Sequence, residues 1–223
     1  MPILSERFGY LFLLAPRTGS TAVAEALCGD AAGRWIPPEN ILDRRGRIMV
    51  QKKHATARQL VRAGLLAKKD LAELTIFTTV RNPFDSLVSL YVKKRNTYQP
   101  LRQREDSFVN RIPGYSSDMD FVMNHTFSAW IERRYGLASR VPLLGIHLYR
   151  RYLRDAHDVM RFESLETDLQ TIAARLGVGP LSLGQKNVTR EREPGYRPYY
   201  TEKARRIVGK IFRPDLDRFG YRF

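Results

Sequence analysis

Apolar and polar positions along the chain alternate between strand-length runs and segments with helical features. In chain order they cover residues 9–15, 19–28, 47–51, 56–66, 74–80 and 83–95. Continuous runs of large apolar residues are typical of parallel strands buried on both faces. A βαβαβα order predicts a parallel sheet with right-handed crossovers. We therefore expect an α/β fold, with a central parallel sheet flanked by helices in three layers and ligands at the carboxyl edge of its strands.

The pattern changes after residue 95. Residues 96–117 combine Pro100, Pro113 and Gly114 with many polar groups, which predicts an excursion on the acceptor side that acts as a lid. The later expected elements are a helix at 118–135, a strand or helix at 141–152, a strand at 157–163, a helix at 165–176 and a helix from Thr201 to about Phe212. A chain of 223 residues with 43% apolar content is long enough for one well-buried domain, so a single domain over 1–223 is expected.

The charge balance favours anionic ligands. The 38 basic residues exceed the 23 acidic residues by a net charge of +15, which attracts a nucleotide, an acidic polysaccharide or an anionic membrane surface, so peripheral membrane contact stays open. Because the cations are scattered in pairs and no zinc-finger or RNA-binding signature is present, the pattern argues against nucleic acid as the partner. Among these groups, Lys93 to Arg95 is the cluster expected to touch a ligand.

Other features bound the class of protein. Cys28 is the one cysteine, so an internal disulfide is excluded and a buried thiol is expected. The sequence shows no Asp, Glu and His cluster with metal-ligand spacing, which predicts a reaction without a metal. The apolar run at 10–15 is too short to span a bilayer and no export signal precedes it, so we expect a cytoplasmic protein. The oligomeric state is left open.

The first apolar run breaks into a loop rich in hydroxyl groups. The residues expected to bind an anion there are Arg17, Thr18, Gly19, Ser20 and Thr21. A turn at the carboxyl end of a buried strand presents the free N–H groups of the next helix, and the arginine adds a fixed charge. The loop does not fit the Walker A pattern, since Leu14 stands where its first glycine should be and Ser20 where its lysine should be. We therefore predict a P-loop-like site for a phosphate or sulfate, and disfavour a nucleotide triphosphatase.

A second segment predicts further residues that bind the ligand. Residues 76–80 form a β-branched and aromatic run of strand length, and Pro83 is allowed in the first turn of a helix. Arg81 therefore lies at the carboxyl end of a strand, while Ser89 lies about two turns into the following helix. One phosphate is expected to be held by both residues.

The two segments together resemble sulfotransferases, which take a sulfuryl group from 3′-phosphoadenosine 5′-phosphosulfate (PAPS) and release 3′-phosphoadenosine 5′-phosphate (PAP). The loop from Pro16 to Thr21 is similar to the family's loop after its first strand, and Arg81 with Ser89 to its 3′-phosphate site. The resemblance implies that Arg17 and Lys52 stabilise the leaving group. It also implies that His54, two residues after Lys52, acts as the base on the acceptor hydroxyl, a role that suits a neutral imidazole.

The same resemblance offers a rival base. Some bacterial and Golgi members use a glutamate after the first helix, and Glu39 lies in such a region. A carboxylate needs desolvation to become basic near neutral pH, so His54 is favoured over Glu39.

The remainder of the chain is also similar to this family, over about residues 8–221. Phe162 to Leu165 matches the end of a family strand, and 186–190, 199–202 and 215–221 resemble segments of bacterial and Golgi-type carbohydrate sulfotransferases. The resemblance implies that Arg190 closes over the nucleotide and that the acceptor is a carbohydrate or glycolipid hydroxyl. A small phenol or secondary metabolite stays open as acceptor, because 29–46 and 96–155 carry no motif that selects one. The alternative function is a non-catalytic, basic P-loop-like protein that binds nucleotide or nucleic acid.

Overall fold

The computed structural model describes residues 1–141, 145–184 and 194–223. As far as they are described, the residues divide into two compact units, one formed by Met1–Arg81 and Tyr149–Val188 and the other by Asn82–Leu148 and Thr189–Phe223. In these described parts of the chain, no helix combines the length and the apolar character needed to cross a membrane. The single domain expected from the chain length stays a prediction.

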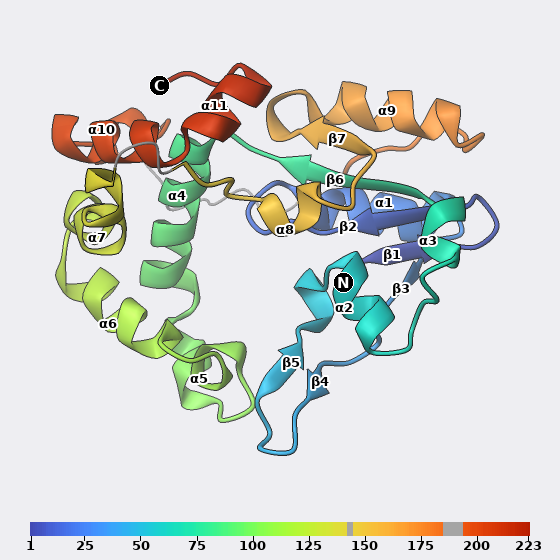
Figure 1. Cartoon of the computed structure of the whole chain (residues 1–223), viewed down its shortest axis with the longest axis horizontal. Coiled ribbons are helices and arrows are strands. Elements are labelled where there is room, and N and C mark those ends of the chain that lie inside the picture. The colour runs from blue at the N-terminus through green and yellow to red at the C-terminus, as the bar shows by residue number, and fades with distance from the viewer. Residues whose placement is uncertain (142–144, 185–193) are drawn as a thin grey trace. The chain divides into compact units, whose positions relative to one another are not determined.

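The first unit contains a five-stranded sheet (Figure 1). Its strands are β1 (Ile3–Ser5), β2 (Tyr10–Leu13), β3 (Arg34–Trp35), β6 (Thr75–Val80) and β7 (Asp158–Arg161), in the spatial order β3-β1-β2-β6-β7. The strands β2, β6 and β7 are parallel neighbours, whereas β1 pairs antiparallel with both β2 and β3. The mixed α/β fold with a central, mostly parallel sheet is thus confirmed, and the short strands β1 and β3 are additions to it.

One strand was assigned to the wrong sheet. The expected strand at 47–51 exists as β5 (Ile48–Val50), but it pairs antiparallel with β4 (Ile41–Leu42) in a separate two-stranded sheet. The physical reason is its exposure, since Met49 is 57% exposed and β5 is therefore not buried on both faces as a central strand must be. The residues that follow β5 therefore extend from the hairpin-like β4–β5 sheet and not from a strand of the parallel sheet.

The three longer helices of the first unit agree with the segments expected at 19–28, 56–66 and 165–176. The longer ones are α1 (Ser20–Asp30), α2 (Ala57–Arg62) and α9 (Leu165–Arg175), and the shorter ones are α3 (Asp70–Glu73), α8 (Arg150–Leu153), η1 (Lys52–His54) and η5 (Phe162–Ser164). Thr56 and Gln59 form a reciprocal capping box that fixes the start of α2. Helix α8 shows that the described end of the ambiguous segment 141–152 is helical.

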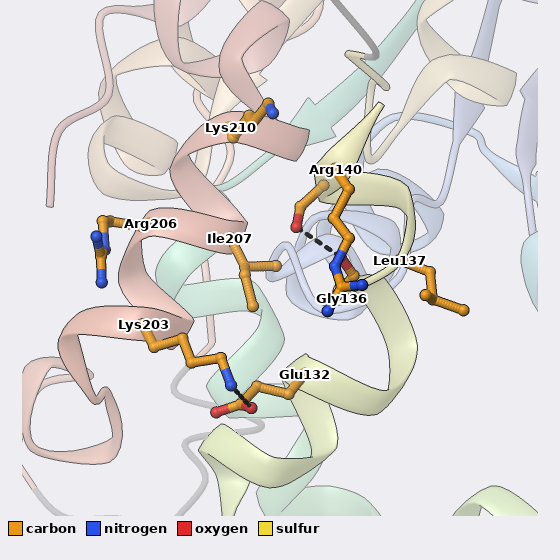
Figure 2. A pocket seen from close by; sticks show the side chains of 9 residues that line it. Glu132, Gly136, Leu137, Arg140, Lys203, Arg206, Ile207 and Lys210 are labelled. Carbon is orange, nitrogen blue, oxygen red and sulfur yellow. Dashed lines mark hydrogen bonds and ion pairs between the residues drawn. The ribbon is translucent and has the colours of Figure 1, made fainter. Parts of the chain in front are cut away.

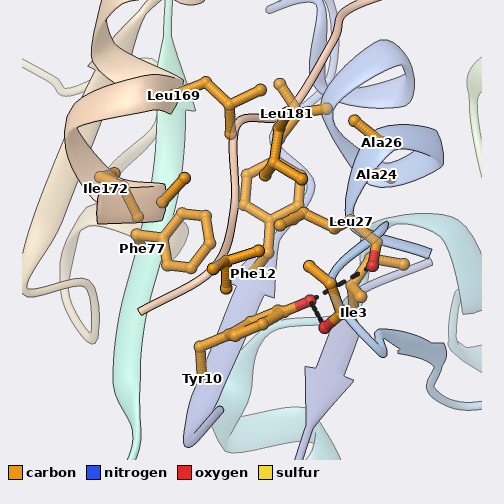
Figure 3. Packing of buried hydrophobic residues seen from close by; sticks show 14 of the residues in the cluster. Ile3, Tyr10, Phe12, Ala24, Ala26, Leu27, Phe77, Leu169, Ile172 and Leu181 are labelled. Atoms are coloured by element: carbon orange, nitrogen blue, oxygen red, sulfur yellow. Dashed lines mark hydrogen bonds between the residues drawn. The ribbon is translucent and has the colours of Figure 1, made fainter. Parts of the chain in front are cut away.

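The core of this unit holds the end of β2 in place. Phe12 on β2 and Phe77 on β6 stack with ring centroids 5.1 Å apart, and residues of α1 and α9 pack around them (Figure 3). The Tyr10 hydroxyl donates to the carbonyl of Ala31 at 3.0 Å, which ties β2 to the end of α1. Leu11 and Leu13, on the opposite face of β2, are also fully buried. Because β2 is covered on both faces, the loop after it starts from a rigid strand.

In its described residues, the second unit is helical. Its elements are α4 (Pro83–Val92), α5 (Phe108–Arg111), α6 (Tyr115–Asn124), α7 (Phe127–Tyr135), α10 (Glu202–Ile211), α11 (Arg213–Phe219), η2 (Lys93–Thr97), η3 (Gln99–Gln103), η4 (Ala138–Arg140) and η6 (Arg197–Tyr199). The helix expected at 118–135 is two helices, since the hydroxyl of Thr126 caps α7 through the N–H of Ala129. Thr201 caps α10, as predicted. Residues 96–117 form short helical pieces, and their role as a lid stays a prediction.

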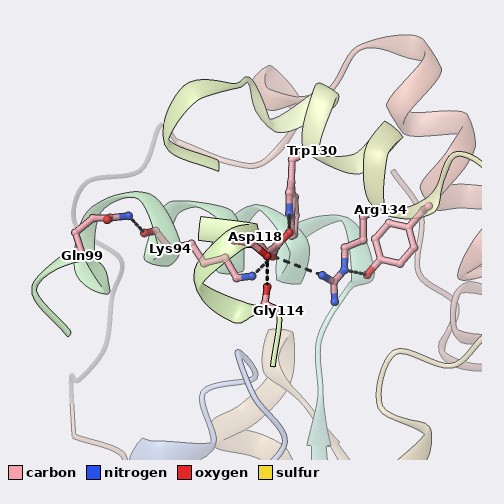
Figure 4. A network of polar contacts seen from close by, with 8 residues as sticks. Lys94, Gln99, Gly114, Asp118, Trp130 and Arg134 are labelled. Carbon is pink, nitrogen blue, oxygen red and sulfur yellow. Dashed lines mark hydrogen bonds and ion pairs between the residues drawn. The ribbon is translucent and has the colours of Figure 1, made fainter. Parts of the chain in front are cut away.

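A buried ion pair organises this unit (Figure 4). Lys94 is 2% exposed, and its ammonium pairs with the Asp118 carboxylate, which also accepts from Trp130 Nε1 at 2.9 Å and lies 3.5 Å from Arg134. Lys94 was expected to touch a ligand with its neighbours in the cluster 93–95. That expectation is wrong for Lys94, because its side chain is used inside the protein.

Candidate functional site

The loop between β2 and α1 has an unusual backbone. Gly19 precedes α1 in the left-handed region with φ of 73°, and Arg17 also has a positive φ, of 67°. A residue with a Cβ rarely adopts this conformation, and such strain is commonly found at binding sites. The loop thereby turns sharply enough for the first N–H groups of α1 to lie at the carboxyl end of β2.

Gly19 is required for a second reason. A Cβ atom at this position would lie 2.9 Å from side-chain carbons of both Phe162 and Leu165. The loop is therefore packed against the segment that follows β7, with space for glycine alone.

Two hydroxyl groups of the loop serve the fold. Thr18 is fully buried, and its hydroxyl donates to the carbonyl of Ala15 at 2.8 Å and contacts the hydroxyl of Thr79 on β6. Ser20 donates to the same carbonyl at 2.8 Å. These two hydroxyl protons are thus directed to Ala15, so anion binding by Thr18 and Ser20 would rest on their backbone N–H groups in this conformation, and the roles of Gly19 and Thr21 stay predictions.

Arg81 lies at the carboxyl end of β6, as its sequence position predicts. Its guanidinium stacks on the ring of Phe162 with 3.9 Å to the centroid, and Nη1 donates to the carbonyl of Arg17 at 3.3 Å. The ends of β2, β6 and β7 are therefore joined around two arginines. The sequence singled out Phe162 through its motif, but gave no signal that this ring would orient Arg81.

The β4–β5 sheet brings a third segment to the same loop. After β5 the chain forms the turn η1, in which the N–H of Lys52 donates to Asn40 Oδ1 at 2.8 Å. His54 Nδ1 lies 2.8 Å from the carbonyl of Leu14, two residues before Pro16. This contact places the imidazole beside the loop, although β5 does not belong to the parallel sheet.

The environment of His54 fixes its proton state. A carbonyl oxygen accepts only, so Nδ1 carries the proton and Nε2 is the basic nitrogen. Burial, aided by the charges of Lys53 and Arg17 and opposed by the hydrogen bond to Leu14, lowers the pKa of His54 to about 4. The imidazole is therefore neutral at physiological pH, and the lone pair of Nε2 is available for a proton.

Lys53 is part of the same electrostatic cluster. Partial burial of its ammonium lowers its pKa, and the positive charge of Arg17 acts in the same direction. Because the charge of Arg17 acts on Lys53, the two cations lie close together, and an anion bound there would be stabilised by both charges.

The remaining predicted residues have different positions. Lys52 and the rival base Glu39 are both exposed, and the contact between Lys52 and Asn40 shows that they lie on neighbouring strand ends. Ser89 is fully buried on α4 of the second unit, so its joint role with Arg81 stays a prediction. Arg190 lies outside the described residues. Among the described residues, no group of three His, Cys, Asp or Glu side chains is positioned to hold a metal ion.

These features define the class of protein. A strand, a tight loop and a helix N-terminus beside Arg17 and Arg81, with a neutral imidazole at their border, have the geometry expected of an α/β site for an anion. Residues 4–222 match the model of the sulfotransferase family, and the chain belongs to that family of transferases. No curated protein and no solved structure gives a significant match to the chain.

Proposed function

We propose that this sulfotransferase uses PAPS as its donor and transfers the sulfuryl group to a hydroxyl of a carbohydrate or glycolipid. The observation that carries the proposal is the contact between His54 Nδ1 and Leu14, because it sets a neutral base beside an anion-binding loop. The acceptor class rests on the similarity of the carboxyl-terminal segments to carbohydrate sulfotransferases, and is the finer part of the proposal.

The residues around the loop fit a phosphosulfate donor. Helix α1 has eleven residues, so its N-terminus carries the full effect of the helix dipole, and no acidic residue occupies its first turn. Arg17, Lys53 and Arg81 add positive charge around the loop. When bound, PAPS supplies a sulfuryl group attached to a phosphate that leaves with additional negative charge.

The side chains of this chain have three tasks in such a reaction. His54 takes the proton of the acceptor hydroxyl at Nε2, which makes that oxygen nucleophilic. Arg17 and Lys52 stabilise the charge that develops on the leaving phosphate oxygen. Transfer in line requires the hydroxyl and the donor to be held in fixed positions, and the rigid strand behind the loop serves that need.

Binding of the product PAP tests the donor. Isothermal titration should give tight binding that is lost in Arg17→Ala and Arg81→Ala, while Arg62→Ala, an exposed arginine on α2, should bind like the wild type. Indifference to PAP, together with DNA binding that weakens steeply with salt, would instead favour the non-catalytic alternative.

Turnover tests the base. With labelled PAPS and a panel of saccharides, glycolipids and phenols, His54→Ala should lose at least about 100-fold in kcat, within the usual contribution of a general base. Glu39→Ala should retain most of the activity. The reverse result would transfer the role of base to Glu39, and turnover of phenols alone would refute the acceptor class.

A further inference from the structure

A cationic hollow in the second unit is lined by none of the residues assigned to the candidate site (Figure 2). It has a volume of about 380 Å³ and is formed by α7, η4 and α10. The charged residues that line it are Glu132, Arg140, Lys203, Arg206 and Lys210. A hollow of this size accommodates a small polar group such as a phosphorylated headgroup.

The charges of the hollow are concentrated by helix geometry. Lys203, Arg206 and Lys210 follow one another at intervals of three and four residues, so they share one side of α10. Glu132 of α7 pairs with Lys203. Within the described residues, no carboxylate lies at ion-pair distance from Arg140, Arg206 or Lys210. Four cations and one carboxylate leave three net positive charges, which an anion would stabilise.

Exposed apolar side chains border this hollow. Leu137 lines it and is 78% exposed, and Val141, directly after Arg140, is 50% exposed. In Figure 2 the Leu137 side chain points away from α10. One exposed leucine by itself needs no explanation, but apolar groups that border a cluster of unpaired cations match the polarity of a lipid surface, where anionic headgroups lie next to hydrocarbon.

We propose that this face docks on a membrane surface with anionic phosphate headgroups. A headgroup phosphate occupies the hollow between Arg140 and the cations of α10, and Leu137 with Val141 enters the boundary between headgroups and acyl chains. A soluble anion would neutralise the cations but leave both apolar side chains in water, so the lipid surface is the occupant that accounts for both observations. Docking is independent of the donor and the acceptor proposed above.

Sedimentation with vesicles tests the proposal. The full chain should bind vesicles of phosphatidylcholine mixed with phosphatidylglycerol and should not bind phosphatidylcholine alone. Each basic residue near an anionic leaflet contributes about fivefold, so Arg140→Gln/Arg206→Gln/Lys210→Gln should weaken binding on the order of 100-fold. Leu137→Ser should weaken it about tenfold, because an inserted leucine side chain would be lost.

Matched controls separate docking at this face from general attraction by the net charge. Arg62→Gln/Lys68→Gln/Lys69→Gln removes the same charge from exposed positions in the first unit, and Met123→Ser removes an apolar side chain that is 40% exposed. Both should bind vesicles like the wild type. Equal losses in the two triple variants would overturn the proposal.

A competition experiment distinguishes a lipid headgroup from a soluble anion as the occupant of the hollow. Inorganic phosphate and glycerophosphoglycerol, which lacks acyl chains, should compete weakly. Tight binding of either, together with full vesicle binding by Leu137→Ser, would make the hollow a site for a soluble anion and refute membrane docking. All variants should retain PAP binding if the donor proposal holds. If the wild type does not bind PAP at all, the proposal that PAPS is the donor is contradicted, and the vesicle result still tests membrane docking.

Discussion

The half-buried imidazole of His54 should make the stability of the protein depend on pH. The perturbation is His54→Asn, whose side-chain amide can replace Nδ1 as the donor to Leu14 but cannot titrate. In the folded protein the pKa of His54 is lowered to about 4, whereas in the unfolded chain it returns to about 6.5. The unfolded state therefore binds the proton first as the pH falls, and folding stability decreases with it.

The size of the effect follows from these two values. Below about pH 4 the full loss is about 3 kcal/mol, since one unit of pKa corresponds to about 1.4 kcal/mol. Between about pH 7.5 and pH 5 the loss is about 2 kcal/mol, because the unfolded state is by then largely protonated at this residue and the folded state is not. The stabilisation is thus complete above about pH 6.5 and disappears as the pH falls toward 4.

Urea denaturation at a series of pH values measures this difference. The free energy of unfolding of the wild type should fall by about 2 kcal/mol more than that of His54→Asn over the range from about pH 7.5 to pH 5. The comparison concerns how the free energy of unfolding changes with pH, so a destabilisation of the variant that is equal at every pH does not affect it. His125→Gln, which removes an exposed imidazole stacked on Phe121, is the matched control and should follow the wild type. Parallel curves for wild type and His54→Asn would refute the reasoning.

Three further substitutions test other parts of the structure. Gly19→Ala should lower the free energy of unfolding by about 2 kcal/mol and weaken PAP binding, because of its positive φ and a Cβ contact of 2.9 Å; unchanged urea curves would contradict this. Arg17→Gly should abolish PAP binding while stability stays equal or rises by up to about 1 kcal/mol, since glycine accepts a φ of 67°; a clear fall in stability would show that its backbone is not strained. Asp118→Asn leaves the Lys94 ammonium buried without a counter-charge and should cost about 3 kcal/mol, whereas Asp217→Asn, in an exposed pair, should change the urea midpoint little.

Much of the parallel sheet could be predicted because its central strands are buried on both faces. Residues 10–13 and 75–80 lie in apolar or β-branched runs, and helix signals such as Pro83 and Thr201 are local. The strand β1 was missed because Ile3–Ser5 is too short to show a pattern. Its antiparallel partner β2 supplies the hydrogen bonds that make it a strand.

The site was less predictable, since it depends on contacts between distant residues. The positions of Arg17 and Arg81 follow from strand ends, but the role of Phe162 in orienting Arg81 depends on a stacking contact that no spacing reveals. Lys94 looked like a surface cation because its partner Asp118 lies 24 residues further along the chain. A threonine in such a loop suggests a hydroxyl group that binds the ligand. The fold determines its actual hydrogen-bond partner, which for Thr18 is the carbonyl of Ala15.

The two candidate bases, Glu39 and His54, differ in their environments in the structure. Glu39 and His54 precede and follow the β4–β5 sheet, whose pairing of Ile41 with Val50 brings the two sides of the hairpin together. The resemblance to the family offered both bases from different members, and the structure adds that they flank the same small sheet. The structure separates them by environment, since Glu39 is exposed whereas His54 is half-buried and directed by Leu14. The hydrogen bond to Leu14 holds one imidazole nitrogen of His54 beside the loop and leaves Nε2 available for a proton, whereas the Glu39 carboxylate lies in water. This difference, rather than the spacing of residues, is the argument for His54.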